Sequence, residues 1–330
     1  MSVKSVLTCA PLRISLLGGG TDFSSYYLKS SGAVLTAAID QYVYVHIKKH
    51  NPLFQERYRI SYSDVEHCQS RVEIKNDIVR ASLELLGIEE PLQISTSADL
   101  PANSGLGSSS SFAVALLLGL HELKGEQVGA AQLAEEACRV EIELLKSPIG
   151  KQDQYAASFG GLNLVEFKSD ETVSIEPIST QYEIVKDLFA NASMIWTQQS
   201  RHANSVLEDQ EKRASQNEMN LDSLKYLVFE LRDEIRSVSP SMEQIGRLIN
   251  QGWEIKKNLS PLILTKEINE LLQEISQLDI YGGKLLGAGA GGFILSIHKN
   301  LSKDLKTIST KWAAFSPRLD HSGARILSSN

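Results

Sequence analysis

A glycine- and serine-rich segment in the first half of the chain has the residue types of an anion-binding loop. Residues 100–112 read LPANSGLGSSSSF, between an expected strand and an apolar expected helix. Gly105 and Gly107 let the backbone turn sharply and approach a ligand closely. The serines that follow begin the helix, where free N–H groups and the positive dipole end attract anions. A polyphosphate would use the whole run of donors, whereas a simple helix cap, the alternative, needs one serine. No G-x-x-x-x-G-K-[ST] motif occurs, so the segment is not a P-loop.

A carboxylate falls inside the apolar stripe of the next expected helix, residues 130–146. The stripe comprises positions 130, 133, 134, 137, 144 and 145, and helical spacing places Glu141 within it and Glu143 outside it. A carboxylate buried without a partner is costly or becomes protonated. We therefore expect a cation beside Glu141, either Mg²⁺ or an arginine. A salt bridge at the surface edge of the stripe is the structural alternative.

An aspartate follows in the sequence PIGKQDQYAASFGG, residues 148–161. We expect Asp153 to lie in a glycine-containing loop, where catalytic residues are common, although a turn or a helix cap is the ordinary role of such a residue. Lys151 could neutralise substrate charge, keep the aspartate ionised, or be a solvated loop lysine. Phosphoryl transfer needs positioning, charge neutralisation and one group that orients or deprotonates the nucleophile. That Ser109, Glu141 and Asp153 form such a set is what the family resemblance given below implies.

Two further glycine-rich segments lie near the ends of the chain. APLRISLLGGGTDFSSYY, residues 10–27, places Arg13 on an expected strand and Asp22 after three glycines. KLLGAGAGGFIL, residues 284–295, contains a literal G-x-G-x-x-G. A dinucleotide-binding fingerprint opens a helix, whereas here a strand-like segment follows and fewer than 40 residues remain. The pattern favours a glycine loop over a dehydrogenase site.

The elements that must position these residues indicate an α+β protein in two parts. Strands are expected at 3–10, 13–17, 33–47, 58–62, 92–97, 161–167 and 172–178, and helices at 72–86, 109–123 and 130–146. After Met194 a strand precedes long helical stretches up to residue 278, then a strand at 293–298, a helix at 301–312 and a short final strand. We expect two domains, 1–185 and 186–330.

Composition narrows the class of protein. The 330 residues are 42% hydrophobic and 22% charged, which is typical of a globular protein. A formal net charge of −7 argues against a nucleic-acid scaffold, so an anionic substrate needs a local basic site. The three cysteines include no Cys-x-x-Cys pair, so neither a disulfide framework nor a zinc site is expected, and a reducing cytosol is the expected compartment. The start lacks an apolar signal region and the apolar run 112–120 is too short for a membrane span. We expect a cytoplasmic protein without membrane or nucleic-acid partners; its oligomeric state is open, with a homodimer as one alternative.

The three loops, in this order, resemble the signatures of the GHMP kinases (galacto-, homoserine, mevalonate and phosphomevalonate kinases). PANSGLGSSS resembles the loop that wraps the ATP phosphates in that family. The resemblance implies ATP phosphate-binding residues at Gly105, Leu106, Gly107, Ser108, Ser109 and Ser110. It also implies Mg²⁺ ligands at Ser109 and at Glu141, which precedes a Pro-x-Gly by seven residues. The implied fold has an N-terminal domain like ribosomal protein S5 domain 2 and a ferredoxin-like C-terminal domain, with ATP in the cleft between them.

The same resemblance implies which residues bind the sugar and which act on its hydroxyl. Asp153 is implied to accept the proton of the attacking hydroxyl, and Arg13 to stabilise charge near the transferred phosphoryl group. Galactokinase has Glu-His where this chain has Gly19 and Gly20, which puts galactose in doubt. GGGTD together with GKQDQY is similar to the D-glycero-D-manno-heptose 7-phosphate kinases of this family, and some L-fucose kinase domains share it. The implied substrate-binding residues are Gly19, Gly20, Thr21, Asp22, Lys151, Arg201, Gly289, Ala290 and Gly291.

The function implied by the resemblance is phosphorylation of the anomeric hydroxyl of a heptose 7-phosphate by ATP and Mg²⁺. The product would serve nucleotide-activated heptose biosynthesis for surface polysaccharide. Arg201 and His202 begin an expected helix and are candidates for holding the substrate phosphate, with Arg325 as a weaker one. Two alternatives remain: a kinase of an unphosphorylated sugar such as L-fucose or galactose, and a catalytically silent sensor of the same fold.

Overall fold

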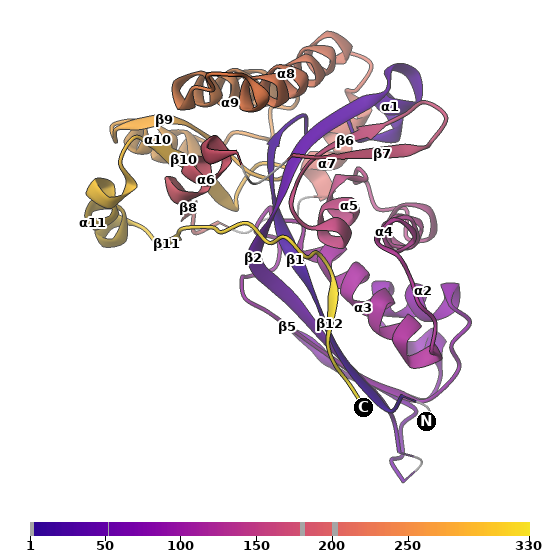
Figure 1. Ribbon diagram of the computed structural model, residues 1–330. Coiled ribbons are helices and arrows are strands. Elements are labelled where there is room, and N and C mark those ends of the chain that lie inside the picture. Colours follow the sequence, from indigo (N-terminus) through magenta and orange to yellow (C-terminus); the bar gives the residue numbers. More distant parts are fainter. Residues whose placement is uncertain (1–2, 52, 179–181, 200–203) are drawn as a thin grey trace.

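The first part of the molecule is built on an eight-stranded sheet (Figure 1). The computed structural model describes residues 3–51, 53–178, 182–199 and 204–330. The main path of the sheet is β12-β1-β2-β5-β3-β4, with β6 on β2 and β7 on β6. Its strands are β1 (Ser5–Leu17), β2 (Gly32–Lys49), β3 (Tyr58–Ser61), β4 (Val65–Cys68), β5 (Leu92–Ala98), β6 (Leu162–Phe167), β7 (Val173–Pro177) and β12 (Arg325–Ser329). The strands expected at 33–47, 58–62, 92–97, 161–167 and 172–178 are confirmed, those expected at 3–10 and 13–17 form the single strand β1, and β4 is an addition.

Strand β1 runs through Pro11 without interruption, although the sequence predicted two strands on either side of it. The register between β1 and β2 shifts at Pro11, between that residue and Leu12. A proline cannot donate a ladder hydrogen bond, and an irregularity in the pairing is where a strand tolerates it. The consequence for function is that Arg13 and Ser15 lie on one continuous, buried strand.

Helices cover one face of this sheet (Figure 1). Helix α3 (Ser108–Lys124) packs on β1 and β2 and is buried along most of its length, as its apolar sequence predicts. Around it lie α2 (Asp77–Leu85), α4 (Ala130–Cys138) and α5 (Gln152–Phe159), while α1 (Ser24–Ser30) connects β1 and β2. The helix predicted from residue 72 begins later, because the Asn76 side chain accepts a hydrogen bond from Val79 N at 3.1 Å and caps α2.

The helix predicted for residues 130–146 is regular only over α4. It continues as a π-helical segment, Arg139–Leu144, in which Leu145 N bonds to Val140 O. The wider turn shifts the side-chain register, so Leu144, expected in the buried stripe, is 44% exposed. Glu141 remains buried, with 1% exposure. Single π-helical turns often occur at functional sites.

The second part of the molecule contains a four-stranded antiparallel sheet, order β11-β8-β10-β9, with helices packed around it. This arrangement confirms the expected α+β class. The strands are β8 (Ala192–Trp196), β9 (Ile280–Leu285), β10 (Phe293–His298) and β11 (Ala314–Phe315). The helices are α6 (Glu183–Ala190), α7 (Asn204–Lys212), α8 (Glu218–Arg236), α9 (Met242–Lys256), α10 (Lys266–Ile275) and α11 (Leu301–Lys311). Strand β9 was not predicted, because its two adjacent glycines resemble a loop.

The last strand returns to the first sheet. Strand β12 pairs with β1, and Asn330 O accepts hydrogen bonds from Lys4 N and Ser5 N at 2.6 and 3.1 Å. Figure 1 shows the two ends of the chain close together. The division into two domains at residue 185 remains a prediction. Strand β12 follows the second part in the sequence but belongs to the sheet of the first part.

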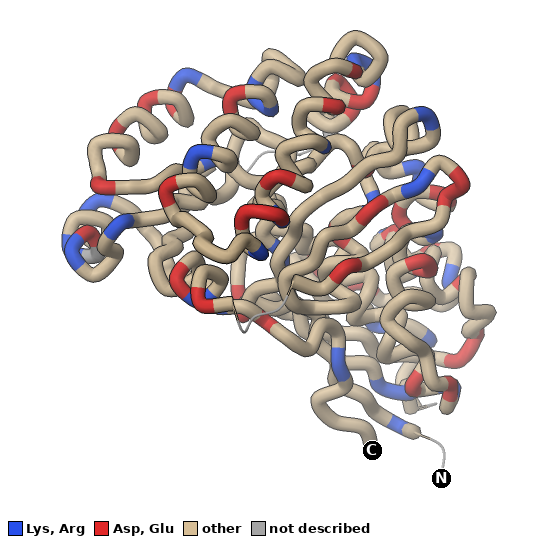
Figure 2. The backbone as a smooth tube through the Cα atoms, turned by 45° about the horizontal axis from the view of Figure 1, so that its top comes forward, with Lys and Arg blue, Asp and Glu red and all other residues tan. Residues whose placement is uncertain are grey.

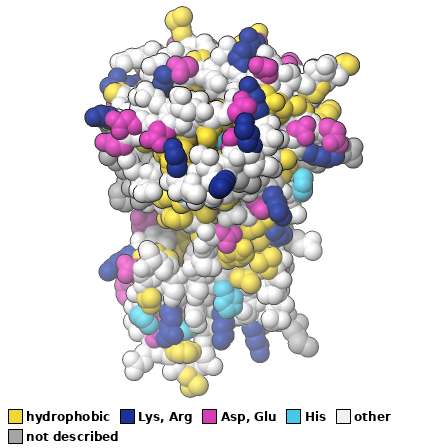
Figure 3. Space-filling view, turned by 90° about the vertical axis from the view of Figure 1, so that its left-hand side faces the viewer, with side chains coloured by type: hydrophobic (Ala, Val, Ile, Leu, Met, Phe, Trp, Pro, Cys, Tyr) yellow, Lys and Arg dark blue, Asp and Glu magenta, His cyan; other side chains and the backbone are white. Residues whose placement is uncertain are grey.

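Charge is distributed evenly over the outer elements. Figure 2 shows acidic and basic residues alternating along the helices, and Figure 3 shows them intermixed on one face. An anionic ligand must therefore be attracted by basic groups within its own site. Within the described ranges, the helices are all too short or too polar to span a lipid bilayer.

Candidate active site

The expected loops meet at one cavity of about 280 Å³ between the two parts of the molecule. Its walls come from the loop after β1, the start of α3, the π-helical segment and the start of α5. The second part contributes α7, α9 and the loop after β9. The three glycine-rich segments, which are far apart in sequence, therefore share a single site.

The start of α3 forms one end of the cavity. Gly107, with φ of 77°, is the residue before the helix, and Ser108, Ser109 and Ser110 line the cavity after it. The αL conformation of Gly107 is one that other residues adopt at a cost. The Leu106 side chain is fully buried and its carbonyl accepts a hydrogen bond from Arg13 N at 3.0 Å. The expected contact of its backbone N–H with phosphate stays a prediction.

The second glycine loop touches the first through its backbone. A Cβ on Gly287 would lie 2.5 Å from Gly105 Cα, and a Cβ on Gly105 would lie 2.9 Å from Leu286 O. Such close approach is open only to glycine. The two halves of the molecule are thus in contact at the edge of the cavity, which fixes the position of the loop after β9.

Arg13 and Asp153 form a bidentate ion pair in the cavity. Arg13 Nε donates to Asp153 Oδ1 and Nη2 to Oδ2, both at 2.7 Å, while Nη1 donates to Gly105 O at 2.6 Å. Two parallel charge-assisted hydrogen bonds fix the plane of the carboxylate. A Cβ on Gly107 would lie 3.0 Å from Asp153 Oδ2, so the carboxylate faces the start of α3. Asp153 lies in the first turn of α5 and not in a loop as predicted.

Glu141 lies behind the serines. Ser109 Oγ donates to Glu141 Oε1 at 2.5 Å and Gln154 Nε2 donates to Oε2 at 2.7 Å. Burial raises the pKa of Glu141, and the hydrogen bond from Ser109 opposes that shift. Of the two expected cations, an arginine is not present among its described partners. A hydroxyl and a carboxylate oxygen that both line a cavity form a donor set suited to Mg²⁺.

The loop after β1 presents Asp22 and Gly20 to the cavity. Gly20 N donates to Asp22 Oδ1 at 2.9 Å and Gln152 N to Oδ2 at 3.2 Å. Burial raises the pKa of Asp22. Thr21 points away, because its hydroxyl lies 2.9 Å from Gly18 O and 2.8 Å from Ala33 O, either of which can accept its one hydrogen, and accepts a hydrogen bond from Ala33 N at 3.0 Å. Thr21 therefore shapes the loop and does not line the cavity.

Several expected substrate residues lie elsewhere. Lys151 Nζ lies 4.9 Å from the centre of the Tyr27 ring, outside the cavity wall. In the third loop the residues that line the cavity are Gly287 and Ala288, two positions before those expected. Gly289 and Ala290 pack on Ile263, and Gly291 packs on Gln199.

The basic candidates for a substrate phosphate are also absent from the described cavity wall. Arg201 and His202 lie outside the described residues. Arg325 Nη1 donates to Asp320 Oδ2 at 3.0 Å, and the guanidinium lies 4.8 Å from the centre of the Tyr42 ring. Its charge is therefore neutralised on β12, away from the cavity.

One basic residue in the cavity was missed from the sequence. Lys256, at the end of α9, is 8% exposed, and its Nζ donates to Gly287 O at 2.8 Å. Burial, followed by the charge of Arg13, lowers the pKa of Lys256 to about 8. The available signal was its position: Ile249, Gly252 and Lys256 follow one another on the buried face of α9, while Lys257 points outward. The same test that identified Glu141 would have found this lysine.

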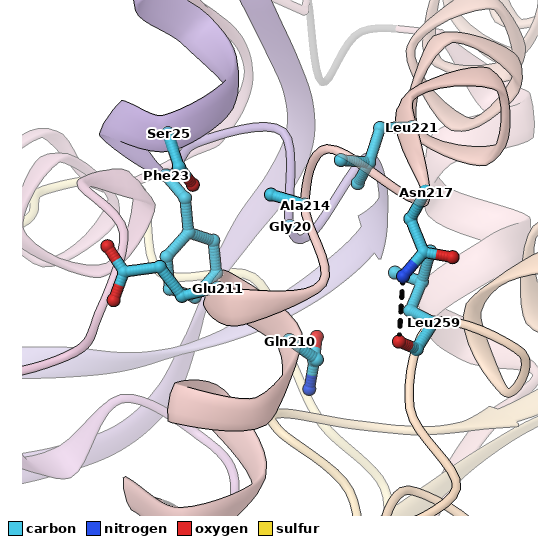
Figure 4. A pocket seen from close by; sticks show the side chains of 9 residues that line it. All are labelled: Gly20, Phe23, Ser25, Gln210, Glu211, Ala214, Asn217, Leu221 and Leu259. Carbon is cyan, nitrogen blue, oxygen red and sulfur yellow. Dashed lines mark hydrogen bonds between the residues drawn. The ribbon is translucent and has the colours of Figure 1, made fainter.

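A narrow annex continues the cavity past Gly20 and Phe23 (Figure 4). Figure 4 shows it between the loop after β1 and helices α7 and α8, with Asn217 Nδ2 bonded to Leu259 O at 2.9 Å. Its described wall is largely apolar and contains no lysine or arginine. At about 10 Å³ the annex has room for one water molecule.

Comparisons with known proteins agree with this architecture. Residues 74–161 match the GHMP kinases N terminal domain and residues 231–312 match the GHMP kinases C terminal family. The chain is 28% identical over 305 residues to the D-glycero-alpha-D-manno-heptose 7-phosphate kinase of Campylobacter jejuni, covering 88% of this chain and 89% of that enzyme. It is 26% identical over 325 residues to the galactokinase of Pyrococcus furiosus, covering 89% of each.

A solved structure has the same fold over nearly the whole chain. It is that of a D-glycero-D-manno-heptose 1-phosphate kinase from Bacteriodes thetaiotaomicron, with a TM-score of 0.79 and 24% identity, covering 98% of this chain and 99% of that one. The two family matches together span just over half of the chain. The chain therefore belongs to the GHMP kinases and is an ATP-dependent phosphotransferase with a hydroxyl group as acceptor.

Proposed function

We propose that the protein phosphorylates the anomeric hydroxyl of D-glycero-D-manno-heptose 7-phosphate and produces the 1,7-bisphosphate. The observation that carries the proposal is the Asp153 carboxylate, held by Arg13 and facing the start of α3. The extended similarity to the heptose 7-phosphate kinase of Campylobacter jejuni supports the class of sugar. Gly19 and Gly20 support it further, because they leave space beside the acceptor.

In the proposed reaction the triphosphate of ATP lies along residues 105–110. Asp153 accepts the proton of the anomeric hydroxyl, whose oxygen forms a bond to the γ-phosphorus. The bond from that phosphorus to the β–γ bridging oxygen breaks, and ADP leaves with the electron pair. Arg13 holds Asp153 in place and offsets the negative charge that develops beside it. Asp22 accepts hydrogen bonds from sugar hydroxyls.

Ser109 and Glu141 are the residues that would hold Mg²⁺. Their oxygens are of the type that this ion prefers, and both line the cavity next to the expected phosphates. The bound ion would supply positive charge to the phosphate oxygens. Gln154 keeps the Glu141 carboxylate in orientation through its 2.7 Å hydrogen bond.

The proposal extends to the setting of the reaction. A 1,7-bisphosphate is a suitable precursor for a nucleotide-activated heptose, and we place the protein in the cytoplasm, in the supply of surface polysaccharide. A kinase of unphosphorylated sugars is the second candidate. The similarity to the galactokinase of Pyrococcus furiosus favours it.

An acceptor comparison tests the proposal. Wild-type protein with MgATP is assayed for ADP release with heptose 7-phosphate, heptose 1-phosphate, galactose and L-fucose, and phosphorus NMR identifies the position of the new phosphate. We expect the highest kcat/KM for heptose 7-phosphate and a product phosphorylated on the anomeric oxygen. A higher kcat/KM for a free hexose would support the second candidate. ADP release with none of the sugars would contradict both.

A further inference from the structure

Lys256 is a buried cation in the cavity without a carboxylate partner. Its described hydrogen bond is to the carbonyl of Gly287, and no described carboxylate lies within ion-pair distance of its Nζ. An ammonium group has three donors, so two remain for a ligand. The carboxylates of Asp22 and Asp153 are near but do not pair with it directly, and an anion that enters the cavity would add a counter-charge in contact with the buried ammonium.

Two other polar side chains converge with Lys256 beside Gly19. The point where a Cβ of Gly19 would lie is 3.3 Å from Lys256 Nζ, 3.3 Å from Ser15 Oγ and 3.5 Å from Gln152 Nε2. These groups come from α9, β1 and α5. Ser15 is 3% exposed, and neither its Oγ nor Gln152 Oε1 has a hydrogen-bond partner among the described residues. All three residues also line the cavity, so an ammonium, a hydroxyl and an amide lie close enough together to bind one tetrahedral oxyanion beside Gly19.

The other basic residues near the cavity are already engaged. Arg13 donates to both oxygens of Asp153 and to Gly105 O. Lys151 lies over the ring of Tyr27. The annex in Figure 4 has an uncharged wall apart from Glu211, which would repel an anion. Among the described residues that line the cavity, Lys256 is the cation left for a ligand.

The position of this cluster relative to Asp153 indicates which anion it binds. Ser15 follows Arg13 by two residues on β1, so their side chains point the same way about 7 Å apart. Arg13 binds Asp153, so its side chain lies next to that carboxylate and to the expected position of the attacking hydroxyl. The start of α3 and the loop before it contact β1 at Pro11 and Arg13, through Ser111 Oγ and Leu106 O, and Ser15 lies about 7 Å further along the strand. A group there is reached by the far end of a sugar and not by the phosphoryl group in transfer.

We propose that Lys256, Ser15 and Gln152 form the subsite for a phosphate monoester on the acceptor. The class of acceptor rests on the function proposed above. The subsite explains how a chain with an overall negative charge can select a phosphorylated sugar, and it replaces Arg201 as the main candidate for this role. Gly19 keeps the space open because a side chain there would occupy it.

Because Lys256 must be protonated to attract a phosphate, the use of a phosphorylated acceptor should depend on pH. Its neighbours are Arg13 on β1, Lys284 on β9, and the carboxylates of Asp22 and Asp153. A phosphate dianion favours the ammonium form, so binding at pH 8 should take up a proton. The kcat/KM for a phosphorylated acceptor should fall as pH rises through about 8, the pKa of free Lys256. Lys256→Arg keeps the charge and should lose this alkaline limb.

Lys256→Met tests the subsite directly. We expect the KM for heptose 7-phosphate to rise about 10- to 100-fold, while the KM for ATP changes less than about threefold. Lys257→Met is the matched control, since Lys257 is the neighbouring lysine and pairs with Glu254 outside the cavity. A weaker affinity for a non-hydrolysable ATP analogue with an unchanged KM for the sugar phosphate would assign Lys256 to the nucleotide and overturn the proposal.

Gly19→Ala is an independent test that keeps every charge. Gly19 does not have a positive φ, so alanine suits the backbone, and its methyl group enters the space between the three side chains. In wild type we expect inorganic phosphate to compete with the acceptor, and in Gly19→Ala we expect that competition to weaken about tenfold or more. A wild type that uses only free sugars would contradict the proposed substrate. Absence of competition by phosphate would contradict the subsite itself.

Discussion

The two cations of the cavity have opposite surroundings. Arg13 donates to both oxygens of Asp153 and to a carbonyl, so its charge is balanced within the protein. Lys256 has one carbonyl as partner and lacks a described carboxylate. The first arrangement is complete before any ligand arrives and orients a reactive group. The second obtains its counter-charge from a ligand, which makes it a recognition site. Substitutions at the two positions should therefore change different kinetic constants.

The largest effect is expected from Asp153→Asn. Loss of the proton acceptor should lower kcat by about 10²- to 10⁴-fold, and nucleotide binding should change little, since the phosphate donors at the start of α3 are untouched. Steady-state ADP release gives kcat and calorimetry gives the nucleotide Kd. Asp64→Asn, at an exposed aspartate, is the control. A kcat within threefold of wild type would remove Asp153 from the mechanism.

The next effect comes from exchanging the two types of cation. Arg13→Lys cannot hold both carboxylate oxygens in one plane, so kcat should fall about 10- to 100-fold. Lys256→Arg still presents a cation to a phosphate, and the KM for the acceptor should stay within about tenfold. Equal losses of kcat in both variants would show that Arg13 and Lys256 have the same role, and the assignment of Arg13 to orientation and Lys256 to recognition would be wrong.

Glu141→Gln should act on metal dependence alone. The amide keeps the shape of the buried side chain but removes the charge, so the Mg²⁺ concentration for half-maximal activity should rise about tenfold. Glu143→Gln is the control, because Glu143 is exposed on the same segment. An unchanged Mg²⁺ requirement in Glu141→Gln would mean that this carboxylate is only structural.

The smallest expected effect is a change in the pH dependence of stability that arises from His121. Measuring it shows whether a loss of activity at alkaline pH comes from unfolding or, as proposed, from Lys256. His121 lies between Glu136 and Glu126, at 2.7 and 2.9 Å, and the hydrogen bond to Glu136 raises its pKa. The protonated form is favoured in the folded state, so this stabilisation is complete below the unfolded pKa of about 6.5 and is lost as pH rises through the raised folded pKa.

His121→Gln should remove that pH dependence. Urea unfolding at pH 6 and pH 9 gives the change in free energy of unfolding between the two pH values, and the value at pH 6 relative to pH 9 should be about 1 kcal/mol more favourable in wild type than in the variant. Contributions of other groups, such as Lys256, are the same in both proteins and cancel in this comparison. The acceptor KM of His121→Gln should match wild type at both pH values. If the variant kept the full difference in stability, another group would have to be responsible.

Local patterns predicted most of the fold. The long β-branched segment of β2, the paired β6 and β7, and the serine-rich start of α3 all show periodicity or turn residues that act over short distances. Glu141 was identified because a charge on an apolar face is a local contradiction. The π-helical turn was not predicted, because the prediction applied α-helical spacing to the whole of residues 130–146.

The parts that were missed depend on contacts between distant residues. The ion pair of Arg13 and Asp153 joins positions 140 residues apart, and no spacing in the sequence reveals it. The same holds for the convergence of Lys256 with Ser15 at Gly19. For the third loop, the glycine pattern located the segment, but its contact with Gly105 decides which residues face the cavity. Lys256 itself was open to prediction from its place on α9.

The pairing of β1 with β12 has a consequence for how the molecule is made. Val6 to Cys9 pair with residues 325–329, so one edge of the strand that bears Arg13 and Ser15 is covered by a segment that is synthesised long after it. Pairings between such distant segments form late and slow folding. During synthesis the growing chain carries an unprotected strand edge, and we expect chaperone capture to be strongest in that interval and to cease once β12 has docked.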